Sequence, residues 1–219
     1  KRKQEELIDP NRHANRILKT LMNDLGMDRL PERIECFDNS NTGGEEPVAA
    51  MVCFINGKPD KKEYRHFNIK TVVGPDDFAS MEEVITRRYS RVLEEQSPLP
   101  DLIIIDGGKG QLGAAYQALV QLKIQDKVML IGIAKRLEDI YKVGESLPLY
   151  IDKKSESQKL LQNIRDEVHR FGITHHRKRR AKKSISSELD QITGIGPKTK
   201  EQLLNHFKSV KKIKEASLE

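Results

Sequence analysis

Cysteines and long hydrophobic runs are both scarce in the sequence, and each shortage argues against a class of protein. Only two cysteines occur in 219 residues, Cys36 and Cys53, and neither has the spacing of a zinc ligand. We therefore expect two reduced core thiols, as in a cytoplasmic protein, rather than a zinc site or a disulfide framework. No apolar stretch approaches the roughly 20 residues that cross a bilayer, and the N-terminus lacks a signal-peptide pattern. We expect no membrane partner.

The fingerprints of nucleotide binding are also missing. A P-loop requires the spacing G-x-x-x-x-G-K followed by Ser or Thr. The glycine-rich stretch Gly107-Gly108-Lys109-Gly110-Gln111 does not fit that spacing, and no dinucleotide fingerprint or internal repeat occurs elsewhere. A nucleotide-binding function is therefore disfavoured, and the glycines need another explanation.

Positive charge is concentrated at the C-terminal end of the chain. The net charge is +6, and 12 of the 39 Lys and Arg residues lie from Phe171 onward, against 5 of the 33 acidic residues. The stretch from Arg177 to Lys183 holds six basic residues and no acid. This asymmetry indicates an end that binds a polyanion, joined to a nearly neutral body. A solvated basic tail is the alternative.

The spacing of apolar residues predicts a mixed α/β fold. We expect helices near residues 14–25, 75–92, 111–122 and 155–171, and strands near residues 34–37, 48–55, 63–69, 102–105, 128–133 and 140–143. The first three strands form antiparallel hairpins, and the later strands alternate with helices. This order predicts a mixed sheet with helices on both faces, a pattern that several folds share.

Two acidic residues end strands of the predicted sheet. Asp38 follows the first strand, and Asp106 follows the apolar run 102–105. Ligands bind at the carboxyl ends of strands in α/β sheets, so the two acids face each other if their strands are neighbours. Two carboxylates at close range need a cation between them, and Mg²⁺ or Mn²⁺ prefers such oxygen ligands. Taken alone, each acid would be interpreted as a turn or helix cap.

Two further features complete the candidate site. The glycines after Asp106 would let a phosphate backbone approach, and Lys109 could meet its charge. His169 lies beside the apolar stripe of the helix over 155–171, where it could bind a metal or transfer a proton. Asp166 and Glu167 compete for that role, and a lone histidine in this position is more often a packing or capping residue.

The final segment predicts two short helices joined by a tight glycine turn, Gly194-Ile195-Gly196, with Pro197 beginning the second helix. Backbone N–H groups at a helix N-terminus bind anions, and contacts of this kind hold DNA without reading its sequence. Any two helices joined by Gly-Ile-Gly would look similar, but the basic flank favours DNA binding. The residues that would contact DNA phosphates here are Gly194, Gly196, Lys198, Thr199 and Lys200.

Five stretches together carry a family resemblance: RIECFDNSNTGG, IIIDGGKGQL, IGIAKRLEDIY, RDEVHRFGITHHRKRR and ITGIGPKTKEQLLNHF. Their order and spacing are similar to the C-terminal half of the UvrC family of bacterial nucleotide-excision-repair proteins, over nearly the whole chain. The resemblance implies a ribonuclease-H-like mixed sheet flanked by helices, followed by a small all-α helix-hairpin-helix unit. The implied ranges are 1–31 for an N-terminal linker and helix, 32–181 for the endonuclease domain and 186–219 for a truncated helix-hairpin-helix unit. The family usually carries two such units in tandem, and only the first is recognisable here.

The resemblance also implies a function. It implies a metal-dependent endonuclease that makes the 5′ incision in damaged DNA during nucleotide excision repair, as part of the UvrABC system. Its catalytic and metal-binding residues would be Asp38, Asp106 and His169, with Mg²⁺ or Mn²⁺. Its partners would be damaged double-stranded DNA, the UvrB–DNA complex with UvrA acting upstream, and the N-terminal half of the same protein. The DNA-binding residues would include Lys109, Arg177, Lys178, Arg179 and Arg180.

One position departs from the family pattern, and two other functions remain open. Asn41 stands where the family commonly has histidine, which puts any role of that histidine in doubt here. A non-catalytic DNA-binding module could keep the same fold, although the intact Asp38, Asp106 and His169 argue against it. An actin-like ATPase would share the core fold, but it would need a second phosphate-binding glycine loop and no hairpin unit.

Overall fold

The chain divides into two compact units, Lys1–Gly172 and Ile173–Glu219. This computed structural model describes the backbone of residues 10–40, 47–72, 74, 76–134, 139–190, 192, 194–207 and 210–216, and the side chains over 175–188 lie outside that description. The two units are described separately. The domain ranges expected from the sequence stay a prediction.

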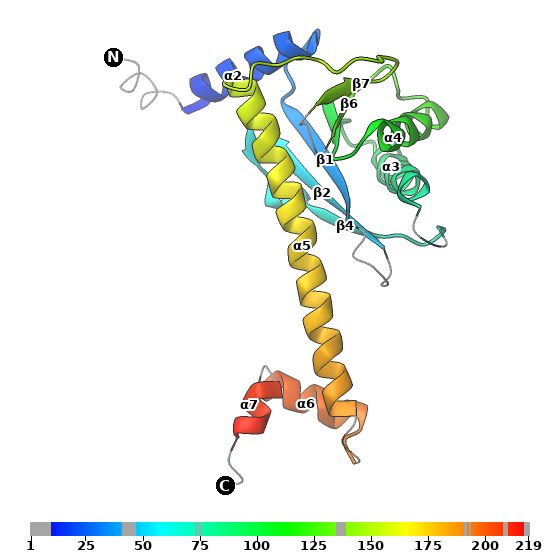
Figure 1. Cartoon of the computed structure of the whole chain (residues 1–219), viewed down its shortest axis with the longest axis vertical. Helices are drawn as coiled ribbons and strands as arrows, with labels where there is room; N and C mark the ends of the chain where they lie inside the picture. Colours follow the sequence, from blue (N-terminus) through cyan, green and yellow to red (C-terminus); the bar gives the residue numbers. More distant parts are fainter. Residues whose placement is uncertain are drawn as a thin grey trace. The chain divides into compact units, whose positions relative to one another are not determined.

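A seven-stranded mixed sheet forms the centre of the first unit (Figure 1). The order across the sheet is β3-β2-β1-β5-β6-β7, and β4 pairs with β2. β1, β5 and β6 run parallel to one another, whereas β2 and β7 run antiparallel to their neighbours. The mixed sheet expected from the sequence is confirmed. The strands are β1 (Arg33–Ser40), β2 (Val48–Ile55), β3 (Lys58–Pro59), β4 (Arg65–Asn68), β5 (Leu102–Ile105), β6 (Met129–Ile133) and β7 (Ile140–Lys142).

Helices cover both faces of this sheet (Figure 1). Residues of α2 and α5 pack with Cys36 and Ile104 in one core cluster, and residues of α3 and α4 pack with Phe37 and Ile105 in the other. Successive residues of β1 and β5 therefore point to opposite faces, as the pleat of a strand requires. The helices are α2 (Pro10–Leu25), α3 (Asp77–Glu94), α4 (Lys109–Gln121), α5 (Glu156–Asp190) and the 3-10 turn η1 (Lys61–Glu63).

Three elements differ from the sequence-based expectation. The strand expected over 63–69 is divided, because β3 and η1 precede the shorter β4. α3 begins only at Asp77, because the Asp76 carboxylate caps it by accepting two backbone N–H bonds of the first turn. α5 continues past Phe171 to Asp190, so the basic run and the first helix expected before the glycine turn both belong to α5. Lys and Arg favour helix, and no proline lies within this stretch to stop it.

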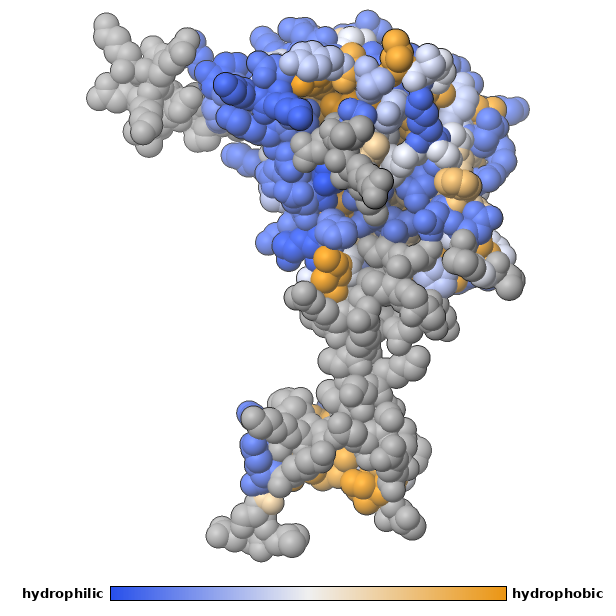
Figure 2. All heavy atoms as spheres, in the orientation of Figure 1, coloured by the Kyte–Doolittle hydropathy of each residue, from blue (hydrophilic) through white to orange (hydrophobic). Residues whose placement is uncertain are grey.

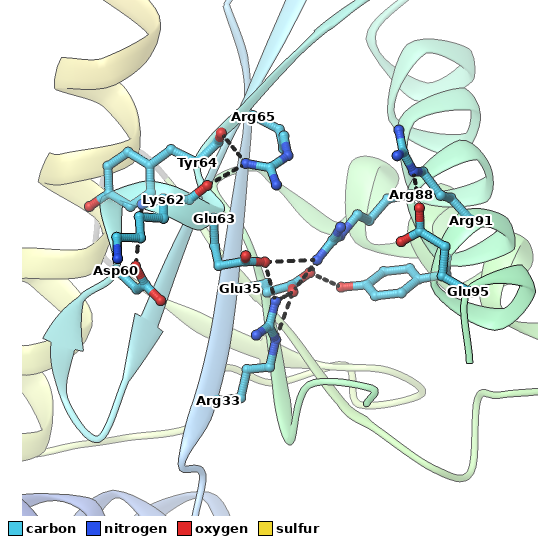
Figure 3. A network of polar contacts seen from close by, with 11 residues as sticks. Arg33, Glu35, Asp60, Lys62, Glu63, Tyr64, Arg65, Arg88, Arg91 and Glu95 are labelled. Carbon is cyan, nitrogen blue, oxygen red and sulfur yellow. Dashed lines mark hydrogen bonds and ion pairs between the residues drawn. The ribbon is translucent and has the colours of Figure 1, made fainter. Parts of the chain in front are cut away.

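A buried carboxylate ties the sheet to α3 (Figure 3). Glu35 on β1 is fully buried and accepts hydrogen bonds from Arg33, Arg88 and the Tyr89 hydroxyl, over distances from 2.8 to 3.2 Å. Glu63 accepts from Arg33 at 3.0 Å. Two carboxylates thus face two guanidinium groups. Burial and the charge of Glu35 raise the pKa of Tyr89 well above its usual range, so its hydroxyl stays a donor.

The second unit contains the end of α5, α6 (Pro197–Phe207) and α7 (Val210–Glu215). α6 begins at Pro197 as expected, where a missing backbone N–H costs nothing. Gly194 has a φ of +95°, a conformation that L residues with side chains rarely adopt. The assignment of this unit as a helix-hairpin-helix stays a prediction.

The surface of the first unit is mainly polar. Figure 2 shows hydrophilic residues over most of its visible face, with hydrophobic residues scattered among them. Scattered apolar residues of this kind are normal on a protein surface. Among the described residues, no helix is both long and apolar enough to cross a membrane.

Candidate metal centre

The two acids lie side by side at the centre of the sheet: Asp106 directly follows β5 as expected, whereas Asp38 lies within β1, which continues to Ser40. β1 and β5 are parallel neighbours with Phe37 opposite Ile105, and the backbone N–H of Asp106 donates to the Phe37 carbonyl at 2.8 Å. Asp38 and Asp106 are therefore the next residues on adjacent strands. Both are buried, with exposed fractions of 0% and 2%. The neighbouring strand order that the pairing of these acids required is confirmed.

Helix α5 brings a histidine to the same acids. Nδ1 of His169 lies 3.1 Å from Oδ2 of Asp38, and the imidazole keeps 54% of its surface exposed. One ligand atom from each of Asp38, Asp106 and His169 lies within 4.8 Å of the others. The structure thus brings together all three residues proposed from the sequence as metal ligands, on the sheet face that α5 covers.

Arg165 is a fourth member of this cluster. Its Nε lies 3.7 Å from Oδ1 of Asp106, and its side chain is 19% exposed. It stands one helical turn before His169 on α5, so both side chains project from the same face of the helix. Sequence reasoning missed Arg165, because an arginine on a helix follows no recognisable motif. Its spacing of four residues from His169 is the one signal that could have found it.

A buried thiol lies close to the two acids, and it is protonated when no metal is bound. Cys36 is fully buried two residues before Asp38 on the same strand face, and burial raises the pKa of its thiol well above the usual range. The nearby charges of Asp106 and Asp38 act in the same direction. The thiol therefore stays protonated, whereas metals bind the thiolate. Cys36 and Cys53 are both free and buried, as expected.

The donor set fits a divalent cation. Two buried carboxylates and one imidazole supply hard oxygen ligands and one nitrogen, a combination that suits Mg²⁺ or Mn²⁺. Because Asp38 lies within β1 and the backbone N–H of Asp106 bonds to β1, sheet hydrogen bonds fix both main chains before any ion arrives. No other group of three or more such residues is found among the described residues.

Comparison with known proteins decides the family. The family model described as "UvrC RNAse H endonuclease domain" matches residues 22–173, which include all three candidate ligands. The chain belongs to the UvrC family. Its sheet is accordingly the ribonuclease-H-like fold that the sequence predicts. Asp38, Asp106 and His169 thus lie within the UvrC nuclease domain.

The relatives of this UvrC domain are longer proteins. The chain is 58% identical over 215 residues to UvrABC system protein C of Christiangramia forsetii, covering 98% of this chain and 36% of the relative. It is 56% identical over 219 residues to the same protein of Porphyromonas gingivalis W83, covering 100% of this chain and 37% of the relative. The chain therefore spans little more than a third of the relatives it matches.

Solved structures give a weaker likeness. Endonuclease V of Ciona intestinalis, solved with a DNA that contains inosine, is 17% identical and covers 62% of this chain and 59% of its own. The TM-score is 0.38. A similarity at this level carries no conclusion about the activity of the UvrC domain described here.

Lys109 has a structural contact within this UvrC domain. Its Nζ donates to the Ser146 carbonyl at 2.6 Å and lies 4.7 Å from the centre of the Tyr141 ring. The turn that precedes it packs tightly, since a Cβ on Gly132 of β6 would come within 3.3 Å of the Gly107 carbonyl oxygen. Lys109 thus joins the start of α4 to the segment after β7. Its predicted role as a phosphate contact stays a prediction.

Asp166 and Glu167, the two alternatives to His169 on α5, make no described contact with the acid pair. Glu167 accepts hydrogen bonds from Tyr64 at 3.0 Å and from Arg170 at 2.6 and 2.7 Å. The Arg170 hydrogen bond lowers the pKa of Glu167, so Glu167 is an anion held in an ion pair. Asp166 is exposed. Among the three, the structure brings only His169 to the acids.

Apart from Lys109, the predicted DNA-binding residues lie in the second unit. Around the glycine turn, Lys200 is partly buried, and the other predicted contacts are exposed, namely Gly194, Gly196, Lys198 and Thr199. Asn41 lies outside the described residues, so its role stays open. The side chains of Arg177, Lys178, Arg179 and Arg180 also lie outside the description, although their backbone belongs to α5.

Proposed function

We propose that this chain is the nuclease part of a UvrC protein and that it hydrolyses a phosphodiester bond of damaged double-stranded DNA. The cut would be the 5′ incision of nucleotide excision repair. The observation that carries the proposal is the convergence of Asp38, Asp106 and His169 at the carboxyl ends of two parallel strands, with ligand atoms within 4.8 Å. The family match to an endonuclease domain supports it.

The chemistry divides between the cation and the protein. Mg²⁺ or Mn²⁺, when bound, would supply a more acidic water and positive charge for the phosphoryl transition state. Asp38 and Asp106 would hold the ion, and their burial on sheet strands keeps them fixed during the reaction. His169 would act as a third ligand or would transfer a proton. Its exposed ring can reach solvent, which the proton-transfer role requires.

DNA would be held mainly outside the acid cluster. Lys109, the basic residues 177–180 and the glycine turn of the second unit are the groups we propose for backbone contacts. No pocket that reads a base is proposed, so the lesion would be selected by partners. Those partners would be the UvrB–DNA complex, with UvrA acting before it, and the N-terminal half of the same protein, all in the cytoplasm.

A nicking assay tests this function. The substrate is a labelled duplex with one lesion, incubated with Mg²⁺ or Mn²⁺, UvrA, UvrB and the rest of the UvrC chain supplied separately. We expect a cut on the 5′ side that appears only when this domain and the divalent ion are both present. Cutting that persists in EDTA, or that does not need this domain, would refute the proposal. A non-catalytic DNA-binding module would bind the duplex and leave it uncut.

A valine at Gly196 should weaken DNA binding and leave metal binding unchanged. A Cβ added at Gly196 meets nothing within 4 Å, and its backbone φ lies outside the region that favours glycine, so Gly196→Val causes no internal clash. A weaker affinity would therefore report a lost close approach to DNA. We expect the Kd for duplex to rise by about tenfold, the scale of one lost hydrogen bond to a charged group.

Fluorescence anisotropy with a labelled duplex measures this effect. Glu201→Gln, exposed on the helix α6 that follows Gly196, provides a control that should bind slightly better because it removes a negative charge. Gly194 is not a suitable position, because its φ of +95° would strain any substituted residue. Equal DNA affinity for Gly196→Val and the parent would remove the proposed role of the glycine turn.

A further inference from the structure

Helix α5 supplies one basic side chain to each acid of the candidate metal centre. His169 faces Asp38 with its Nδ1 3.1 Å from Oδ2, and Arg165 faces Asp106 with its Nε 3.7 Å from Oδ1. The two basic residues are four positions apart, so one turn of helix presents both. Without a metal, the two adjacent carboxylates are therefore each opposed by a group from a single helix.

The two pairs differ in the exposure of the basic group. A guanidinium stays charged at every pH a protein survives. Arg165 is also much less exposed than His169, at 19% against 54% of the side chain. Arg165 therefore places a permanent and largely buried positive charge beside the acid pair.

A divalent cation and Arg165 would compete for the same carboxylate. An ion held by Asp38, Asp106 and His169 requires an oxygen of Asp106, which is the group that Arg165 now opposes. Burying two adjacent carboxylates without a counter-charge is costly, so the metal-free fold depends on such a partner. Once the cation supplies two positive charges, a third beside it is repelled.

We propose that Arg165 is the resident counter-ion of the acid pair, which stabilises the metal-free site and lowers its affinity for the divalent cation. This inference rests on the proposed function, because it takes the three-residue cluster to be a metal site. Arg165 acts through Asp106 and is therefore a positioning residue. Its effect is to keep the site folded between catalytic cycles and to make metal loading reversible.

The experiment compares Arg165→Met with Arg170→Met in the full chain. Both changes remove one arginine from α5 and keep an unbranched side chain, but Arg170 is 57% exposed and pairs with Glu167 instead. Mn²⁺ affinity is measured by isothermal titration calorimetry, and melting temperature is measured in EDTA and in saturating Mn²⁺. Arg165→Lys serves as a third variant that keeps the charge.

Three results are expected for Arg165→Met. Its Kd for Mn²⁺ should fall by about tenfold, the scale on which groups next to the ligands change metal affinity. Its melting temperature in EDTA should fall by roughly 4 °C, because the buried acid pair loses a counter-charge. Saturating Mn²⁺ should restore most of that loss. Arg170→Met should change neither quantity by as much, and Arg165→Lys should lie near the parent.

The outcomes separate this inference from the proposed function. If the parent binds no Mn²⁺ or Mg²⁺ at all, the metal site itself is wrong. If the parent binds Mn²⁺ but Arg165→Met binds it equally well or more weakly, the counter-ion role is wrong and the metal site stands. If Arg165→Met does not fold, Arg165→Lys decides alone: an affinity for Mn²⁺ near that of the parent supports the role, and a clearly weaker affinity contradicts it.

Discussion

Asp106→Asn should lower the rate of 5′ cutting by at least about 10³-fold, because it removes a charged ligand from the centre of the site. The amide keeps the shape of the carboxylate, so the tip of β5 keeps its packing. DNA affinity should stay near that of the parent, since the proposed backbone contacts lie elsewhere. Both quantities are measured on one lesion-containing duplex, cutting by gel electrophoresis and binding by anisotropy.

A second aspartate provides the matched control for that variant. Asp126 is exposed in the segment between α4 and β6, close to the start of β6 and away from the strand end that carries Asp106. Asp126→Asn makes the same chemical change and should cut at the parental rate. If Asp106→Asn still cuts at more than a tenth of the parental rate, the assignment of Asp106 as a metal ligand is wrong.

Glu35→Gln should destabilise the fold by about 3 to 5 kcal/mol, the cost of removing one partner from a buried ion pair. Glu35 is fully buried and is the shared acceptor for Arg33, Arg88 and the Tyr89 hydroxyl (Figure 3). The substitution keeps the volume but leaves two guanidinium groups beside one partly exposed carboxylate, Glu63. Urea unfolding followed by circular dichroism measures the loss.

The control for this prediction uses the other acid of the same network. Glu63 is 33% exposed and bonds to Arg33 at 3.0 Å, which lowers the pKa of Glu63. Water can replace this partner, so Glu63→Gln should cost about 1 kcal/mol or less. Equal losses for Glu35→Gln and Glu63→Gln would show that burial does not set the cost and would contradict the account of the network.

Much of the sheet could be predicted from local patterns. Val48–Ile55 is bounded by turn residues and forms β2 with the expected limits, and the unbroken apolar run Leu102–Ile105 forms β5. A strand buried on both faces has no polar position, so such a run is recognisable. The expected end of α5 near Phe171 was wrong. The charged residues that follow have good helix propensity, but they resemble a solvated linker because the apolar stripe does not continue.

The candidate site could be predicted only in part. Asp38 and Asp106 could be identified because each follows an apolar strand, yet their pairing depended on the order of strands across the sheet. His169 could be assigned to the metal site only from the family resemblance, because a lone histidine beside an apolar stripe is more often a packing or capping residue. Arg165 and the Glu35 network could not be predicted, because each depends on side chains brought together by tertiary packing.

A crystal of this chain soaked in Mn²⁺ tests the central claim most directly, through an anomalous difference map. We predict a peak enclosed by Asp38, Asp106 and His169, at about 2.1 Å from the carboxylate oxygens, the distance at which small divalent ions bind oxygen. Arg165 should have moved away from Asp106. A map with no peak at these three residues, and with Arg165 still against Asp106 at saturating Mn²⁺, would contradict the proposed metal centre.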